Sequence, residues 1–180
     1  MKLKIVKDTN PIMRKRSLEV PLPLAKEDKE LLDEMLLYLK RSQDEEYSKK
    51  HNIRPGVGMA AIQVGVLKRM FVIYLKEEDN EIAMQLVNPK IIESSVKLCA
   101  LEGGEGCLSV DGEHKGLSHR SYKIRMKAFD ALLNEEVDFE AKGYLAIVLQ
   151  HEFDHLNGMF FYDRIDKNEP NKQKLGEVLI

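Results

Sequence analysis

The chain has 180 residues, of which 43% are hydrophobic and 32% are charged, and its formal net charge is −2. A chain of this length can bury one sizeable hydrophobic core, so we expect residues 1–180 to form a single domain. The 28 basic and 30 acidic residues form no long block of one sign, which indicates neither a nucleic-acid partner nor a membrane surface, and no apolar run is long enough to span a bilayer.

The N-terminal part of the chain is predicted to contain one long helix. Pro11, Pro21 and Pro23 argue against a long helix within residues 1–23. No apolar stretch there has the length of a signal peptide, so we expect a cytoplasmic protein. From about Lys26 to Lys50, apolar residues recur at helical spacing between charged ones, which predicts an amphipathic helix packed on one side. The apolar positions are Leu31, Leu32, Met35, Leu36 and Leu39.

The segment Arg54–Gly65, RPGVGMAAIQVG, is the first unusual one. Gly56 and Gly58 allow unusual dihedral angles or the close approach of another backbone. Two other interpretations stay open for this segment: a phosphate loop, although its Lys-Ser/Thr ending is missing, and a tight turn into a strand. Gln63 follows an apolar run, which should bury its neutral amide.

The middle of the chain is predicted to be mostly β-structure. Met70–Leu75 has the composition of a buried strand, and Glu77–Glu81 that of a charged turn. Leu86–Ile92 suggests another pair of strands, because Pro89 should interrupt a single one.

A glycine-rich loop and a hairpin are predicted next. In Glu102–Ser109, three glycines precede Cys107, so its thiol should lie on a loop or bulge where backbone amides are free. Apolar residues then alternate with charged ones along Tyr122–Ala128 and again along Val137–Ala141. These two runs predict an antiparallel hairpin with opposite charges on its outer face.

The segment Gly143–Gly158, GYLAIVLQHEFDHLNG, contains an HExxH pattern. In a helix, His151 and His155 lie on one face about one turn apart, so both imidazoles can bind one metal ion, and Glu152 can reach a water beside it. The apolar run before them predicts a helix buried on most sides, with Gly158 as its stop. The alternative is a pair of core histidines bonded to backbone, with Glu152 at an edge.

The order of these elements predicts an α+β fold, in which antiparallel β-sheets wrap around a central HExxH helix, with an N-terminal amphipathic helix. Alternating βα units are absent from the pattern, which argues against a doubly wound parallel sheet.

Cys107 is a candidate for a third metal ligand. A catalytic zinc-type site usually has three protein ligands, and the two histidines supply only two. The alternative for Cys107 alone is a small buried hydrophobe, the commoner state of a free cysteine. In a reducing compartment, Cys99 and Cys107 are more consistent with burial or metal binding than with a disulfide.

Three segments together resemble the signature motifs of peptide deformylase, in order and in approximate spacing. They are GVGMAAIQ at 56–63, EGCLS at 105–109 and QHEFDH at 150–155. The resemblance extends from Asn10 to about Arg164 and is closest to the longer bacterial subclass. It implies that residues 1–180 form a single catalytic domain. This domain would be a metal-dependent hydrolase that removes the N-formyl group from the N-terminal methionine of newly synthesised proteins and releases formate. Its partners would be nascent polypeptides near the ribosome exit.

The resemblance also implies roles for individual residues. Cys107, His151 and His155 correspond to the ligands of one divalent metal ion, natively Fe²⁺, for which Zn²⁺, Ni²⁺ or Co²⁺ can substitute. Glu152 corresponds to the catalytic acid and base. Gln63 and the backbone N–H of Leu108 correspond to the donors that stabilise the tetrahedral oxyanion.

For the substrate, we expect an extended peptide to pair with the backbone around Val57-Gly58 and Gly106, where glycines give access. An apolar pocket for the methionine side chain would be lined by Val57, Tyr144, Ile147 and Val148. Glu105 and Arg120 are expected to form an ion pair that supports the site.

Two other functions were weighed. An ordinary HExxH metallopeptidase usually takes its third ligand downstream, whereas the remaining histidines, His51, His114 and His119, all lie upstream. A structural metal site in a non-catalytic binding protein usually has four protein ligands, and the sequence offers three beside a glutamate. Both are less consistent with the sequence than an open catalytic site.

Overall fold

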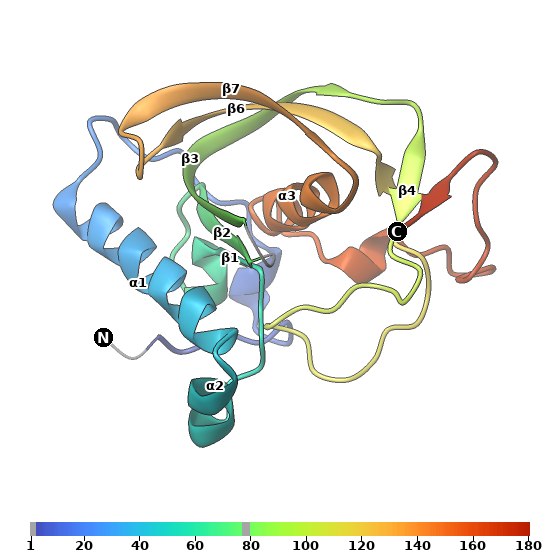
Figure 1. Ribbon diagram of the computed structural model, residues 1–180, viewed down its shortest axis with the longest axis horizontal. Helices are drawn as coiled ribbons and strands as arrows, with labels where there is room; N and C mark the ends of the chain where they lie inside the picture. Colours follow the sequence, from blue (N-terminus) through green and yellow to red (C-terminus); the bar gives the residue numbers. More distant parts are fainter. Residues whose placement is uncertain (1–2, 77–79) are drawn as a thin grey trace.

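The computed structural model describes residues 3–76 and 80–180, so most of the turn predicted at Glu77–Glu81 lies outside the described residues. The chain has an α+β fold with two sheets, as predicted (Figure 1). The larger sheet has the order β1-β2-β3-β6-β7, and the smaller has the order β5-β4-β8. The strands are β1 Gly58–Ala60, β2 Met70–Lys76, β3 Glu81–Ser94, β4 Leu98–Ala100, β5 Arg120–Ser121, β6 Lys123–Asp130, β7 Glu135–Lys142 and β8 Val178–Leu179.

The single helix predicted from Lys26 to Lys50 is wrong, because two helices occupy this region. They are α1, Lys26–Ser42, and α2, Glu45–His51. Asp44 lies between them in extended conformation, and its carboxylate accepts a hydrogen bond from Tyr47 N at 2.7 Å. Aspartate is stabilising as an N-cap and unfavourable inside a helix, so it starts a new helix where the charge pattern alone suggests continuation.

The break predicted at Pro89 is also wrong, because β3 is one continuous strand of 14 residues. Its pairing with β6 shifts between Val87 and Lys90, so the strand contains a bulge there. A bulge leaves a residue without its ladder bond, which is where a sheet tolerates proline. Asn88, at φ +50°, exchanges two hydrogen bonds of 2.8 Å with the backbone of Val20.

The hairpin prediction is confirmed: β6 and β7 pair in antiparallel register, with Arg125 opposite Glu140 and Lys127 opposite Asp138. The expectation of purely antiparallel sheets is wrong for one pair, because β8 runs parallel to β4. This pair joins the C-terminus to a strand about 80 residues earlier in the sequence, which local alternation cannot indicate.

Helix α3, Gly143–His155, carries the HExxH residues and lies beneath the curved strands β3, β6 and β7 (Figure 1). One core fills the space between α3 and the sheet, and a second lies between α1 and the opposite face. Gly158 follows α3 at φ +71°, and a Cβ there would lie 2.3 Å from Arg14 O. Both the left-handed conformation and the close backbone contact require glycine at this position.

Candidate active site

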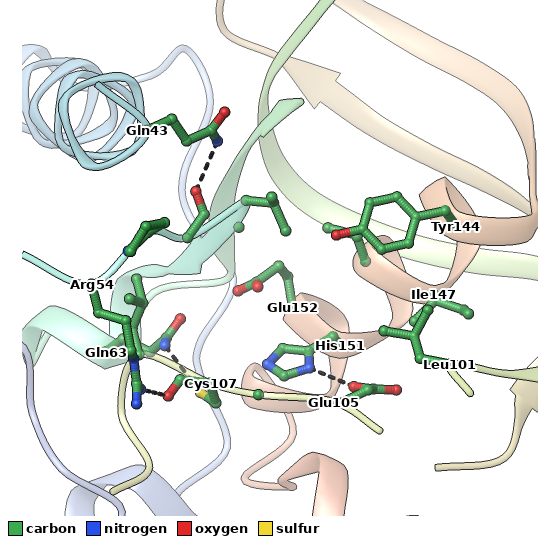
Figure 2. A pocket seen from close by; sticks show the side chains of 17 residues that line it. Gln43, Arg54, Gln63, Leu101, Glu105, Cys107, Tyr144, Ile147, His151 and Glu152 are labelled. Atoms are coloured by element: carbon green, nitrogen blue, oxygen red, sulfur yellow. Dashed lines mark hydrogen bonds and ion pairs between the residues drawn. The ribbon is translucent and has the colours of Figure 1, made fainter. Parts of the chain in front are cut away.

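A cavity of about 350 Å³ opens between three parts of the chain: residues 54–58 with β1, the loop 105–108, and one face of α3 (Figure 2). These are the three segments that the sequence singled out, with about 40 residues between one and the next. The 3-10 helix η2, Ala61–Val64, places Gln63 at the same cavity. Residues 54–65 therefore form a strand and a short helix, and not a phosphate loop.

The ligand atoms of Cys107, His151 and His155 all lie within 4.8 Å of one another. The helical spacing of four residues brings both imidazoles to one face of α3, and the glycine-rich loop brings Cys107 Sγ to 3.2 Å from His155 Nε2. One thiolate and two imidazoles are a donor set that suits Zn²⁺, Fe²⁺, Co²⁺ or Ni²⁺. The arrangement therefore fits a divalent transition metal.

A buried ion network orients His151. Its Nδ1 lies 2.7 Å from Glu105 Oε2, which leaves Nε2 to face the other two ligand atoms. Glu105 also accepts hydrogen bonds from Arg120 Nε at 2.5 Å and Nη2 at 2.9 Å, so the predicted ion pair is present. Arg120 continues to Asp154 Oδ2 at 2.9 Å. Burial raises the pKa of Glu105, but its hydrogen bonds to His151 and Arg120 outweigh this effect and lower the pKa to about 2.

Glu152 lies over the edge of β1, and its side chain points into the cavity (Figure 2). A Cβ added to Gly58 would lie 2.3 Å from Glu152 Oε1, so only glycine leaves room for this carboxyl group. Among the described residues, Glu152 Oε2 is buried without a hydrogen-bond partner. Burial raises the pKa of Glu152 to about 7, which suits a group that accepts and returns a proton near neutral pH.

Gln63 and Leu108 bring hydrogen-bond donors to the side of the cavity that holds Cys107. Gln63 Oε1 accepts from Ala60 N at 2.8 Å, which fixes the amide so that Nε2 points toward Ser109 Oγ at 3.2 Å and Cys107 Sγ at 3.5 Å. The Leu108 N–H donates no hydrogen bond to any atom of residues 3–76 and 80–180. Both groups can therefore donate to an oxygen that develops negative charge.

Known proteins match this chain along nearly its whole length. The polypeptide deformylase family model matches residues 2–171. The peptide deformylase of Macrococcus caseolyticus is 50% identical over 178 residues, which cover 98% of this chain and 96% of that protein. The peptide deformylase of Halalkalibacterium halodurans is 48% identical over 177 residues, which cover 97% of each chain. The crystal structure of a Thermotoga maritima peptide deformylase superposes with a TM-score of 0.71 at 31% identity, covering 92% of this chain and 99% of that one.

The chain belongs to the polypeptide deformylase family. It is an enzyme that removes the N-formyl group from newly synthesised polypeptides, and the two alternative functions are set aside. Deformylases depend on a metal ion, and the ligand cluster of this chain is consistent with that dependence. In the described ranges 3–76 and 80–180, no helix combines the length and the apolar content that crossing a membrane requires.

The deformylase cavity contains every residue that the sequence suggested for substrate binding. These residues are Val57, Gly58, Gly106, Tyr144, Ile147 and Val148. Sequence reasoning missed Gln43, Arg54 and Leu101, which also line the cavity. Gln43 donates to Gly56 O at 2.9 Å and to Tyr74 O at 3.0 Å, so the end of α1 supports the cavity wall. Only Arg54 had a sequence signal, because it is the first residue of the glycine-rich segment 54–65 that contains the first motif.

Cys99 does not belong to the deformylase cavity. It lies on β4 with no exposed surface. Burial raises the pKa of its thiol to about 11, so it stays neutral at ordinary pH. Cys107 is therefore the thiol that is placed for metal binding.

Proposed function

We propose that residues 1–180 form one catalytic domain in which Cys107, His151 and His155 hold a single divalent metal ion for deformylation. The observation that carries the proposal is the convergence of the three ligand atoms beside the buried carboxyl group of Glu152. A metal bound there supplies Lewis-acid activation of a water molecule and of the formyl carbonyl.

Glu152 acts as the proton carrier. Its Oε2 is free of hydrogen bonds from the described residues, so it can take a proton from the attacking water. It then returns that proton to the nitrogen of the leaving amine, which releases formate and a free N-terminal methionine. A pKa near 7 allows the group to exchange the proton in both directions.

Gln63 Nε2 and the Leu108 N–H stabilise the oxyanion of the tetrahedral intermediate. Both donors belong to fixed elements, η2 and the turn after Cys107, so they need little reorganisation when the negative charge develops. Removing one such donor typically lowers kcat by a factor of about 100 or more.

The substrate binds as an extended peptide along the free edge of β1 at Val57-Gly58 and along Gly106. Its methionine side chain packs against the apolar wall formed by Val57, Tyr144, Ile147 and Val148. Figure 2 shows two of these residues, Tyr144 and Ile147, on the same helix as Glu152. Because Glu152 lies directly on Gly58, little room remains for a methyl group on the carbonyl carbon. We therefore expect formyl peptides to react much faster than acetyl peptides.

Fe²⁺ is the native metal in this proposal, with Zn²⁺, Ni²⁺ or Co²⁺ as substitutes. Affinity alone favours zinc over iron, so iron would be loaded according to its availability. We also propose that the enzyme works in the cytoplasm close to the ribosome exit, where formylated N-termini first emerge.

The experiment compares Glu152→Gln, Cys107→Ala and the exposed control Glu136→Gln. Metal content and hydrolysis of formyl-Met-Ala-Ser are measured for each. Glu152→Gln should keep its metal and lose most turnover, Cys107→Ala should lose metal first, and Glu136→Gln should resemble the wild type. A Glu152→Gln protein with undiminished turnover would contradict the proposed role.

A further inference from the structure

The donor N–H of Leu108 belongs to a β-turn that spans Cys107 to Val110. Val110 N donates to Cys107 O at 3.2 Å and closes this turn, with Leu108 and Ser109 at its centre. The same carbonyl, Cys107 O, belongs to the peptide group whose nitrogen is Leu108 N. Whatever binds Cys107 O therefore also determines where the Leu108 N–H points.

Arg54 binds this carbonyl from outside the turn. Its Nη2 donates to Cys107 O, a bond that Figure 2 shows. The same Nη2 donates to Val110 O at 3.0 Å, so one guanidinium nitrogen bridges the first and last carbonyls of the turn. These two carbonyls are the hydrogen-bond partners of Arg54 among residues 3–76 and 80–180. The guanidinium is thus directed at backbone and not at a carboxylate.

Gly56 reinforces the same contact. A Cβ added to Gly56 would lie 2.8 Å from Leu108 Cδ1, so the Leu108 side chain rests directly on the glycine. Arg54 and Gly56, two residues apart, therefore hold the turn through its carbonyls and through the side chain of Leu108.

A trans peptide group is planar, and its C=O and N–H point in opposite directions. A cation that binds Cys107 O fixes the plane, directs the Leu108 N–H away from Arg54, and polarises the group so that this N–H becomes a stronger donor. We propose that Arg54 is a positioning residue for deformylation, which orients and polarises the Leu108 amide that stabilises the oxyanion. The inference rests on the role of Leu108 in the proposed function.

Arg54 also lines the cavity, so the alternative role is that it simply binds substrate. A contact made equally in the ground state and the transition state changes KM, whereas an oxyanion donor acts only in the transition state and changes kcat. The split between kcat and KM therefore separates the two roles.

The first test measures kcat and KM for formyl-Met-Ala-Ser on metal-loaded Arg54→Met, Arg54→Lys and Arg41→Met. Arg41 is a matched control, an exposed arginine over the ring of Tyr47 with no contact to the turn. For Arg54→Met we expect kcat to fall about 10- to 100-fold, less than on removal of a donor, with KM within about twofold of the wild type. Arg54→Lys should be intermediate, because it keeps the charge and loses the fork. A raised KM with unchanged kcat would overturn the inference.

The second test does not require turnover. In Zn²⁺-loaded protein labelled with ¹⁵N-leucine, the Leu108 amide proton should move upfield in Arg54→Met while the other leucine amides stay in place. An unchanged Leu108 resonance would show that Arg54 does not polarise this amide and would overturn the inference. A wild-type holoenzyme without deformylase activity would instead refute the proposed function, whereas the Leu108 resonance would still show whether Arg54 polarises this amide.

Discussion

Two arginines in this enzyme each bind two carboxylates, and their surroundings are opposite. Arg120 lies beneath the cavity, 1% exposed, between Glu105 and Asp154. Arg125 lies on the solvent face of the larger sheet, where it contacts Asp138 at 2.7 Å and Glu93 at 3.0 Å. The distances are similar, so the two networks differ mainly in their access to water.

That difference determines what each network does. Water and salt screen the charges around Arg125, so its ion pairs contribute little to stability. The charges around Arg120 cannot be hydrated, and each must keep its partner. Because Glu105 also binds His151, the buried network additionally orients a metal ligand. Four predictions test this contrast.

The largest effect is expected for Arg120→Met. The methionine fills much of the space but leaves Glu105 and Asp154 buried without this cation, although Arg164 still binds Asp154 at 2.6 Å. Removing one partner of a buried pair typically costs about 3–5 kcal/mol of unfolding free energy. Urea unfolding of the metal-loaded protein measures the loss, and a variant as stable as the wild type would show that the network is not buried in solution.

Acid should reveal the same network through Glu105. Its pKa is about 2 in the folded protein, below the value of about 4.5 expected for the unfolded chain, so the folded state favours the ionised form. The resulting stabilisation is present above about pH 4.5 and is lost as the pH falls through about 2. The difference corresponds to about 3 kcal/mol.

Urea unfolding at a series of pH values between 7 and 2 measures this loss. In Glu105→Gln the corresponding part of the pH dependence should be missing, whereas Asp138→Asn, on the solvent face, should keep it. Equal pH profiles for Glu105→Gln and the wild type would contradict the assignment.

Local sequence could predict the elements of the site but not all of its neighbours. Helical spacing places His151 and His155 on one face, and this needs no information beyond the helix itself. Cys107 lies 44 residues before His151, so its convergence with the histidines could be inferred from ligand chemistry and family resemblance only. Leu101 and Gln43 reach the cavity through tertiary packing, which leaves no periodic signal.

The errors in the fold also have local physical causes. Asp44 fits the charge pattern of a continuous helix, but its carboxylate caps α2. A prediction from periodicity alone therefore treated α1 and α2 as one helix. Pro89 usually ends a strand, but the bulge in β3 absorbs it. The extension of the Glu105–Arg120 pair to Asp154 and Arg164 was missed because it joins charges from separate parts of the chain.

A smaller effect is expected for metal affinity in Glu105→Gln. The amide can still accept a hydrogen bond from His151 Nδ1, but it no longer increases the basicity of the imidazole as a carboxylate does. Changes of this kind typically weaken metal binding about 10- to 100-fold. Competition with a chromogenic zinc chelator measures the affinity, with Glu93→Gln as the control from the solvent-face network. Equal affinities for both variants would mean that Glu105 does not tune the metal site.

The smallest effect is expected for Arg125→Met. Arg125 bridges Asp138 on β7 and Glu93 on β3, so it joins three adjacent strands, yet each of these contacts is open to water. The methionine side chain can still cover the sheet, because an arginine stem packs mainly through its methylene groups. We therefore expect the urea midpoint of Arg125→Met to stay within error of the wild type at 0.15 M salt, with a small decrease only at low salt, where screening is weak. Urea unfolding at a series of NaCl concentrations provides the measurement. A loss of unfolding free energy that is as large as that of Arg120→Met and independent of salt would show that burial does not separate the two networks.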